Sequence, residues 1–424
     1  MLIKFLDFLA HKFDTSPYWK KEKYICFSKQ LPFLGIELST LKEYQVFMES
    51  FRNKNELEPQ RALAFYQTSM EELYKNIFSS LLSFPALGSY TQDLLHVYQQ
   101  IEALPKDLTS CFWIIEYYRW RAALSWKFDS NYLGNIPHKI KDLAKVGGKP
   151  VQNLRLGSPT YERNLLCSAD LVPEFTAFLE AYKAENKQHL YINLQKRSPY
   201  IFRRIFPIHN ESRRCKALEK ASQDYGEVLF FISLPKDTQF YHQKGKFSVS
   251  KYENVAYFRE VFLQILCDGD QSSYYSPQIF QYTSLSLKEL FDKVFTFVWT
   301  CCFDQAPKLE DQERREFIEI SYLFFIDYFI EHLPIHSFNI SCRDSIDRGI
   351  TSNALLLHWN NLMENKHYSQ DFSRFLTAQT LFPALVVRYR SMRSKRFDLL
   401  IRCMERIEKH KEIILSKKSR IKGI

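Results

Sequence analysis

Glycine is scarce in this chain, with 11 residues among 424. Neither G-x-G-x-x-G nor G-x-x-x-x-G-K occurs, so the glycine-rich fingerprints of nucleotide binding are absent. The nine cysteines form no C-x-x-C pair, which favours reduced thiols over a disulfide scaffold and predicts a reducing compartment. No apolar run of about 18 residues occurs, so no transmembrane helix is predicted. Residues 1–10 carry Asp7 in an apolar stretch, which predicts an amphipathic helix and no signal peptide.

Hydrophobic residues make up 46% of the chain, with 36 Phe and 25 Tyr. This is enough material for a large core and for two or three domains. Positive charge, in contrast, is concentrated at the end of the chain. Residues 388–424 hold 13 Lys and Arg against 4 Asp and Glu, which is nearly the whole net charge of +10.

One stretch, 334–349, combines the features of a phosphate-binding loop. A short apolar run predicts a buried strand, Cys342 follows it, and Arg348 comes where a helical pattern begins. A loop between a strand and a helix N-terminus directs backbone N–H groups and the positive helix dipole to one spot, where anions bind. The same field favours the thiolate form of a cysteine, which is the nucleophile. The planar fork of Arg348 can hold two phosphate oxygens.

The residues around this loop carry a resemblance. Cys342-x-Asp344-x-x-Asp347-Arg348 resembles the active-site loop of cysteine-dependent phosphoinositide phosphatases. Sac-domain phosphatases have Cys-x-Asp-Cys-Leu-Asp-Arg and myotubularins have Cys-x-Asp-Gly-Trp-Asp-Arg. The alternative is an ordinary buried thiol at Cys342 and a surface arginine at Arg348.

The loop also departs from the family pattern. Ser345 stands in place of the second Cys of the Sac type, and Ile346 in place of Leu. Gly349 stands where these families usually have the Thr or Ser that stabilises the departing thiolate. Thr351 or Ser352, in the first helical turn, would have to reach the sulfur instead.

The resemblance implies a phosphocysteine mechanism without metal or cofactor. Cys342 attacks phosphorus, and the loop amides and Arg348 stabilise the equatorial oxygens. Asp344 is the first choice for the acid, and Asp237 the second, from another loop. Asp347 is expected to be an ion-pair partner, because a second free carboxylate would repel the substrate. The residues expected to bind the substrate are Arg343, Ser345, Ile346, Asp347, Gly349, Lys236 and Lys196.

Two further strands are predicted at 189–194 and 227–234, with a helix at 211–223 between them, which argues for a parallel pair. The segments 191–197 and 234–243 resemble parts of phosphoinositide-phosphatase effectors of intracellular bacteria of the Legionella and chlamydial kind. Lys196, Lys236 and Asp237 would then lie at strand C-terminal ends, where ligands of open α/β sheets bind. A plain polar turn at 236–237 is the alternative.

These patterns predict three parts. Residues 1–165 read as mostly helical, with periodic segments at 2–13, 40–51, 56–82, 92–101 and 109–126, and 145–158 reads as a linker. An α/β phosphatase domain with a strand, a phosphate loop and a helix covers 166–370, with long helices at 287–299 and 310–332. Residues 371–424 form a basic C-terminal region, helical over 379–406 and beyond.

The basic region would suit an anionic membrane surface. Arg388, Arg393, Arg396 and Arg402 alternate with apolar residues, which is also the pattern of the charged face of a core helix. Nucleic acid would be attracted by the same charge but is not the expected partner.

The sequence thus predicts a phosphoinositide phosphatase, with the 3-phosphate preferred by resemblance. It would act in reducing cytosol, peripherally at membranes, and family likeness adds secretion into a host cell as a bacterial effector. The alternatives are a protein tyrosine phosphatase, although Ser341 replaces the His that precedes the cysteine there, and a non-catalytic module that binds acidic lipid.

Overall fold

The computed structural model describes residues 59–67, 69–71, 74–75, 82–84, 86–103, 135, 137–145, 148–162, 169–197, 211–267, 273–364, 367–388 and 390–422. The helices expected at 2–13, 40–51 and 109–126 lie outside these residues. Within them, no helix is both long and apolar enough to cross a bilayer.

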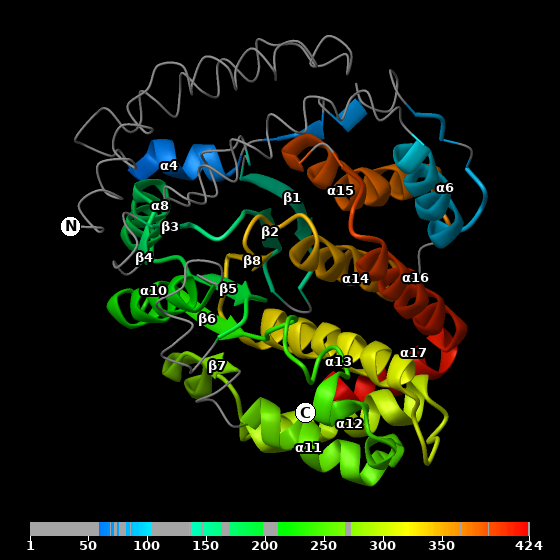
Figure 1. The fold of residues 1–424 in the computed structure, drawn as a ribbon. Helices are drawn as coiled ribbons and strands as arrows, with labels where there is room; N and C mark the ends of the chain where they lie inside the picture. The colour runs from blue at the N-terminus through cyan, green and yellow to red at the C-terminus, as the bar shows by residue number, and fades with distance from the viewer. Residues whose placement is uncertain are drawn as a thin grey trace, which may run out of the picture.

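A six-stranded mixed sheet forms the centre of the molecule, so the chain is of mixed α/β class (Figure 1). The four inner strands are parallel, and the two outer strands run antiparallel to their neighbours. In spatial order the strands are β1 (His138–Leu143), β2 (Val151–Arg155), β8 (Ser337–Ser341), β5 (His189–Asn193), β6 (Leu229–Ser233) and β7 (Tyr274–Tyr275). A separate two-stranded sheet pairs β3 (Thr160–Glu162) with β4 (Ala169–Leu171).

The inner strands are buried on both faces, as expected for a covered parallel sheet, although one face of β8 carries the polar residues Ser337, Asn339 and Ser341. Leu190 and Ile192 of β5 point to one core cluster, whereas Tyr191 between them points to the other. Phe338 and Ile340 of β8 join the first cluster. Strand β8 pairs with β2 on one side and β5 on the other, which puts the end of β8 in the middle of the sheet edge.

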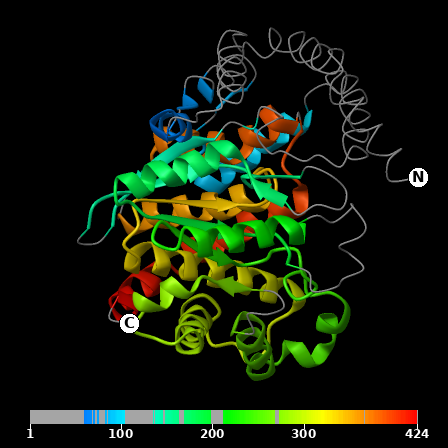
Figure 2. The ribbon, with the colours of Figure 1, turned by 90° about the vertical axis from the view of Figure 1, so that its left-hand side faces the viewer.

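Helices cover both faces of the sheet. On one side lie α8 (Pro173–Ala184) and α10 (Glu211–Asp224), which Figure 2 shows in front of the strands. On the other side lie α13 (Asp311–His332) and α14 (Arg348–Met363). The other α-helices of the described residues are α4 (Pro59–Tyr66), α6 (Tyr90–Ala103), α11 (Val255–Cys267), α12 (Leu287–Cys302), α15 (Gln370–Arg388), α16 (Ser394–Lys409) and α17 (Lys411–Lys422).

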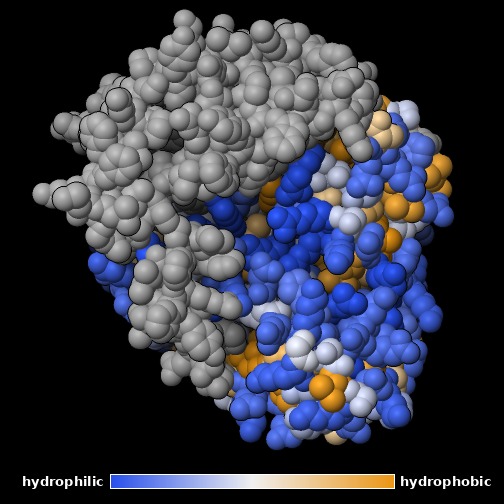
Figure 3. Space-filling model, viewed as in Figure 1, coloured by the Kyte–Doolittle hydropathy of each residue, from blue (hydrophilic) through white to orange (hydrophobic). Residues whose placement is uncertain are grey.

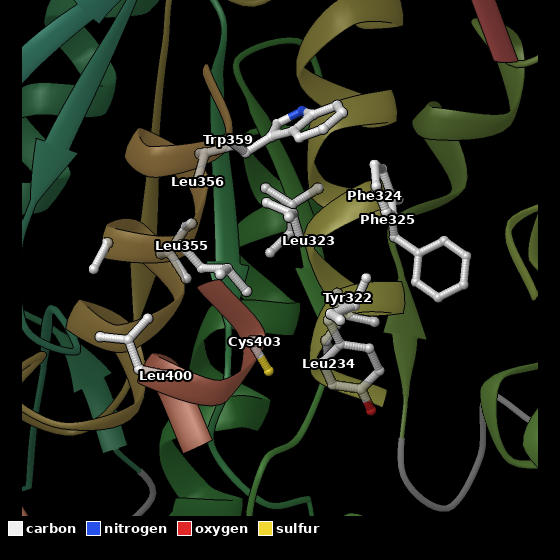
Figure 4. Packing of buried hydrophobic residues seen from close by; sticks show 14 of the residues in the cluster. Leu234, Tyr322, Leu323, Phe324, Phe325, Leu355, Leu356, Trp359, Leu400 and Cys403 are labelled. Carbon is white, nitrogen blue, oxygen red and sulfur yellow. The ribbon is translucent and has the colours of Figure 1, made fainter. Parts of the chain in front are cut away.

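Helix α16, in the basic C-terminal region, is part of the main core. Its Leu400 and Cys403 face α13 and α14 in Figure 4, near Leu323 and Leu355. All four side chains are at most 3% exposed. Each Å² of apolar surface that is removed from water stabilises the folded state by about 25 cal/mol, so the buried face of α16 stabilises its packing against the core. The charged face of a core helix, one of the two alternatives for this segment, therefore describes α16.

Several predicted elements are confirmed. The strands at 189–194 and 227–234 are β5 and β6, and they pair in parallel. The helices at 92–101, 211–223, 287–299 and 310–332 correspond to α6, α10, α12 and α13.

Two boundaries differ from the prediction. The expected linker 145–158 contains β2, and β1 precedes it, so the sheet begins before the expected domain boundary at 165. Turn residues on both sides conceal this short strand, whose Val151 and Leu154 are buried. The expected single helix over 379–406 is two helices, α15 and α16, and buried Met392 lies between them.

Candidate active site

The predicted loop connects the central strand β8 to α14. Cys342 directly follows β8, its side chain is 4% exposed, and Arg348 is the first residue of α14. Because β5 and β6 run parallel to β8, the residues that follow these strands, 194–197 and 234–237, lie at the same edge of the sheet as Cys342. The topology thus brings together the three segments that the sequence singled out.

The backbone of the loop has the properties of an anion-binding nest. The N–H groups of residues 345–349 donate to no acceptor in the described part of the chain, and the first bond of α14 runs from the Thr351 N–H to the Asp347 carbonyl. Ser345 and Ile346 are nevertheless buried. The first N–H groups of a helix have no acceptor within the helix, and together with the N–H groups of the loop they form a run of donors that an anion can accept from. Ser345 has a φ of 50°, in the left-handed region that such nests use.

Gly349 is required by the shape of this loop. A Cβ atom there would lie 2.5 Å from the Ser345 Oγ and 2.7 Å from the Ile340 carbonyl oxygen. The Thr351 and Ser352 hydroxyls donate to the Arg348 carbonyl at 3.1 and 3.0 Å. They therefore fasten the first turn of α14, and the departure from the Ser or Thr of the related families has a steric reason.

The guanidinium of Arg348 is held from the side of α10. Glu211, the first residue of α10, accepts from Nη1 at 3.2 Å and from Nη2 at 2.5 Å, and the Leu194 carbonyl accepts from Nη1 at 3.2 Å. Burial by itself would lower the pKa of Arg348, but the charges of Glu211 and of a Cys342 thiolate raise it above its ordinary value. The Nε–H donates to no acceptor among the described residues, so this edge of the fork is available to a phosphate oxygen.

Asp237 follows β6 and lies beside Arg348. Its Oδ2 is 3.4 Å from Arg348 Nη1, and its Oδ1 is 3.0 Å from His242 Nε2 and 3.5 Å from Arg396 Nη2. Burial would raise the pKa of Asp237, but the His242 hydrogen bond and the two guanidinium groups hold it well below its usual range. The side chain is 46% exposed, so an incoming molecule can reach it.

The two loop carboxylates occupy different surroundings. Asp344 is 8% exposed. Its backbone carbonyl accepts hydrogen bonds from the Asn135 side chain at 2.8 Å and from the Arg155 side chain at 3.3 Å, and Arg155 anchors the loop to β2. Asp347 accepts two bonds from Arg390, at 3.1 and 2.7 Å. This is the ion-pair arrangement expected for a second carboxylate in the loop.

Of the basic residues expected to bind the substrate, Lys236 is buried and Arg343 is exposed. Lys236 is 1% exposed, and its ammonium group contacts Glu319 and, at 2.7 Å, the Ser352 hydroxyl, so it lies inside the protein and not at the surface of the site. The Lys196 N–H donates to Glu211 at 2.8 Å. Figure 3 shows that strongly hydrophilic side chains gather at the centre of the face seen in Figure 1.

No motif in the sequence indicates Glu211 as a site residue, and the pattern around Arg396 indicates only a charged helix face. The position of Glu211 at the start of a helix after a predicted strand is a weak signal for it. Arg396 has no local signal, because packing of α16 against the core brings it to Asp237. Within the described ranges, no three His, Cys, Asp or Glu side chains gather to form a possible metal site.

Comparison of the chain with family models, with curated proteins and with solved structures finds no match.

Proposed function

We propose that this protein is a cysteine-dependent phosphomonoester hydrolase that acts on phosphoinositides. The observation that carries the proposal is the loop 342–349. It combines a buried cysteine at the end of the central strand, a run of backbone N–H groups with no acceptor among the described residues, and an arginine with one edge of its fork available. Each of these features can bind or attack a phosphate group, and all of them lie in the single stretch 342–349.

In the first step the Cys342 thiolate attacks phosphorus in line with the leaving oxygen. The S–P bond forms as the P–O bond breaks, and the charge on the equatorial oxygens is stabilised by the N–H groups of 345–349 and by Arg348. In the second step water attacks the phosphocysteine, which releases inorganic phosphate and restores the thiolate.

We assign the acid of the first step to Asp237, ahead of Asp344. Asp237 is half exposed next to Arg348, whereas Asp344 is buried behind the loop. A phosphate dianion bound at the Nε edge of Arg348 lies close to the Asp237 carboxylate, and its negative charge favours protonation of that carboxylate. The proton then passes to the leaving oxygen, and Asp237 can deprotonate the attacking water.

A phosphoinositide substrate is supported by the resemblance of the loop to lipid phosphatases and by exposed Arg343 in the loop. The 3-phosphate is preferred on the same resemblance. The exposed basic side chains at the junction of α16 and α17, Lys409 and Lys411, suit peripheral contact with an anionic membrane by charge alone, because the apolar face of α16 is inside the protein. The described cysteines are free thiols, as a reducing compartment requires, and secretion into a host cell belongs to the same proposal.

The test is phosphate release from a panel of short-chain phosphoinositides and a phosphotyrosine peptide, with wild type and Cys342→Ser under reducing conditions. We expect release from one or a few inositides, reduced at least about 1,000-fold in the variant, since the nucleophile is lost. Release from the peptide alone would assign a protein tyrosine phosphatase. No release from any substrate, with retained binding of phosphate, would assign a non-catalytic lipid-binding module.

A further inference from the structure

The segment between α15 and α16 contacts two loops of the candidate site at once. Arg390 makes its two bonds to Asp347 of the cysteine loop, and the Arg393 N–H donates to the same carboxylate at 3.2 Å. One turn further on, the Arg396 Nη2 donates to the Lys236 carbonyl at 2.6 Å and lies 3.5 Å from Asp237. The basic C-terminal region therefore reaches into the site.

Arg396 is fixed in this place by its surroundings. The side chain is 11% exposed, and its guanidinium carbon lies 4.9 Å from the centre of the Tyr241 ring. Phe397, the next residue, is 1% exposed and stacks on Tyr98 with ring centroids 4.0 Å apart. The helix cannot turn Arg396 towards solvent without exposing this pair.

The loop that carries Asp237 is also anchored to α13 and α14. The Lys236 ammonium group contacts Glu319 of α13 and the Ser352 hydroxyl of α14, and that hydroxyl donates to the Arg348 carbonyl. Tyr241, at the end of the same loop, donates to Glu319 as well. Lys236 therefore connects the Asp237 loop to the turn of α14 that carries Arg348. Arg396 contacts the same loop from α16.

We propose that Arg396 is a positioning residue for Asp237, so that helix α16 completes the active site. This inference rests on the proposed function. Among the described residues, the charged and titratable groups that face Asp237 are His242 of its own loop, Arg348 of α14 and Arg396 of α16. Arg348 is taken up by the substrate phosphate, which leaves Arg396 and His242 to orient the carboxyl group during the reaction.

Two measurable consequences follow from the geometry. Without Arg396 the carboxyl group is less well oriented, so substrates with a poor leaving group, which need a proton, are affected most. Loss of a nearby cation also disfavours the carboxylate, so Asp237 stays protonated to higher pH. Because Asp237 is protonated in the complex with the phosphate, the descending limb of the pH profile of kcat then moves to higher pH.

The experiment compares Arg396→Met with Arg402→Met on two soluble substrates, a short-chain inositide and p-nitrophenyl phosphate. Arg402 lies on the same helix and is exposed, so it serves as the matched control for charge. For Arg396→Met we expect a loss of about 10- to 100-fold in kcat on the inositide, within the roughly 10²–10⁴-fold effect of an acid catalyst. On the activated aryl ester we expect less than about threefold loss, because its leaving group needs little protonation. Arg402→Met should match wild type on both.

A double-mutant cycle with Asp237→Asn separates positioning from loss of structure. If Arg396 acts through Asp237, Arg396→Met has little further effect once Asp237 is Asn, and Arg396→Lys restores part of the activity in the parent. Equal losses on both substrates with an unmoved pH profile, or additive losses in the cycle, would overturn the inference. If Cys342→Ser is as active as wild type, the proposed function fails and the inference with it. If Cys342→Ser is inactive while Arg396→Met equals Arg402→Met, the inference fails alone.

Discussion

Substitution of Gly349 by alanine perturbs the loop by a single methyl group. The added carbon would lie 2.5 Å from the Ser345 Oγ and 2.7 Å from the Ile340 carbonyl oxygen, whereas side-chain carbons essentially never approach within 3.0 Å. Ser345 could rotate away, but its hydroxyl donates to that same carbonyl at 3.2 Å. The carbonyl belongs to the central strand β8 and cannot move. The strain must therefore pass into the loop and the start of α14.

The magnitude follows from two opposing effects. Overpacking in a buried site costs about 1–3 kcal/mol. A Gly→Ala change also restricts the unfolded chain, which returns roughly 0.4–1 kcal/mol. We expect Gly349→Ala to lower the free energy of unfolding by about 1–2 kcal/mol. Because the strain displaces the N–H groups of 345–349, the loss in phosphate affinity and in turnover should exceed the loss in stability.

Urea unfolding and phosphate release measure the two effects. The matched control is Gly226→Ala, whose Cβ would meet the far end of the flexible Gln278 side chain at 2.5 Å and lies outside the loop. We expect little change in activity for it. Gly349→Ala combined with Ser345→Gly should recover only part of the loss, since the Ile340 oxygen remains. A Gly349→Thr variant with wild-type stability and turnover would refute the steric argument, because it restores the residue of the related families.

Two further predictions concern buried charge. Glu211→Gln leaves Arg348 with Asp237, at 3.4 Å, as its remaining carboxylate among the described residues. We therefore expect the free energy of unfolding to fall by about 2–3 kcal/mol, at or below the lower end of the roughly 3–5 kcal/mol for breaking a buried ion pair. Inorganic phosphate should raise the melting temperature of this variant more than that of wild type, and equal shifts would contradict the role of Glu211 as the partner of the fork. His189 bonds Ser337 and Asn339 of the central strand, and burial lowers its pKa from 6.5 to about 4, although the Asn339 bond works against this. Its folded pKa lies below its unfolded pKa, so its contribution to stability is complete above pH 6.5 and is lost as the pH falls towards 4. Between pH 7.5 and pH 5 the loss amounts to about 2 kcal/mol. Urea unfolding of His189→Gln should show a pH dependence weaker by about that amount, and an unchanged dependence would show that the histidine is not buried in its neutral form.

The strands and helices with strong local patterns were predictable from sequence. The apolar runs that became β5, β6 and β8 and the long periodic helices α12 and α13 lie close to their expected bounds. Strand β2 was not predictable from sequence, because it is only five residues long and lies between turn residues. It is defined by its pairing with β1 and β8. The break between α15 and α16 was missed because Arg390 and buried Met392 look like ordinary residues of a basic helix until their partners are known.

The cysteine loop is predictable from one stretch of chain, because a strand, a cysteine, an arginine and a helix start are local features. The groups that surround the loop depend on the fold. Glu211, Asp237 and Arg396 come from segments far apart in the chain, and they meet because β8 lies between β2 and β5 and because α16 buries its apolar face in the core. The physical reason is that local propensity acts over a few residues, whereas charge pairing and burial act wherever the fold brings groups together.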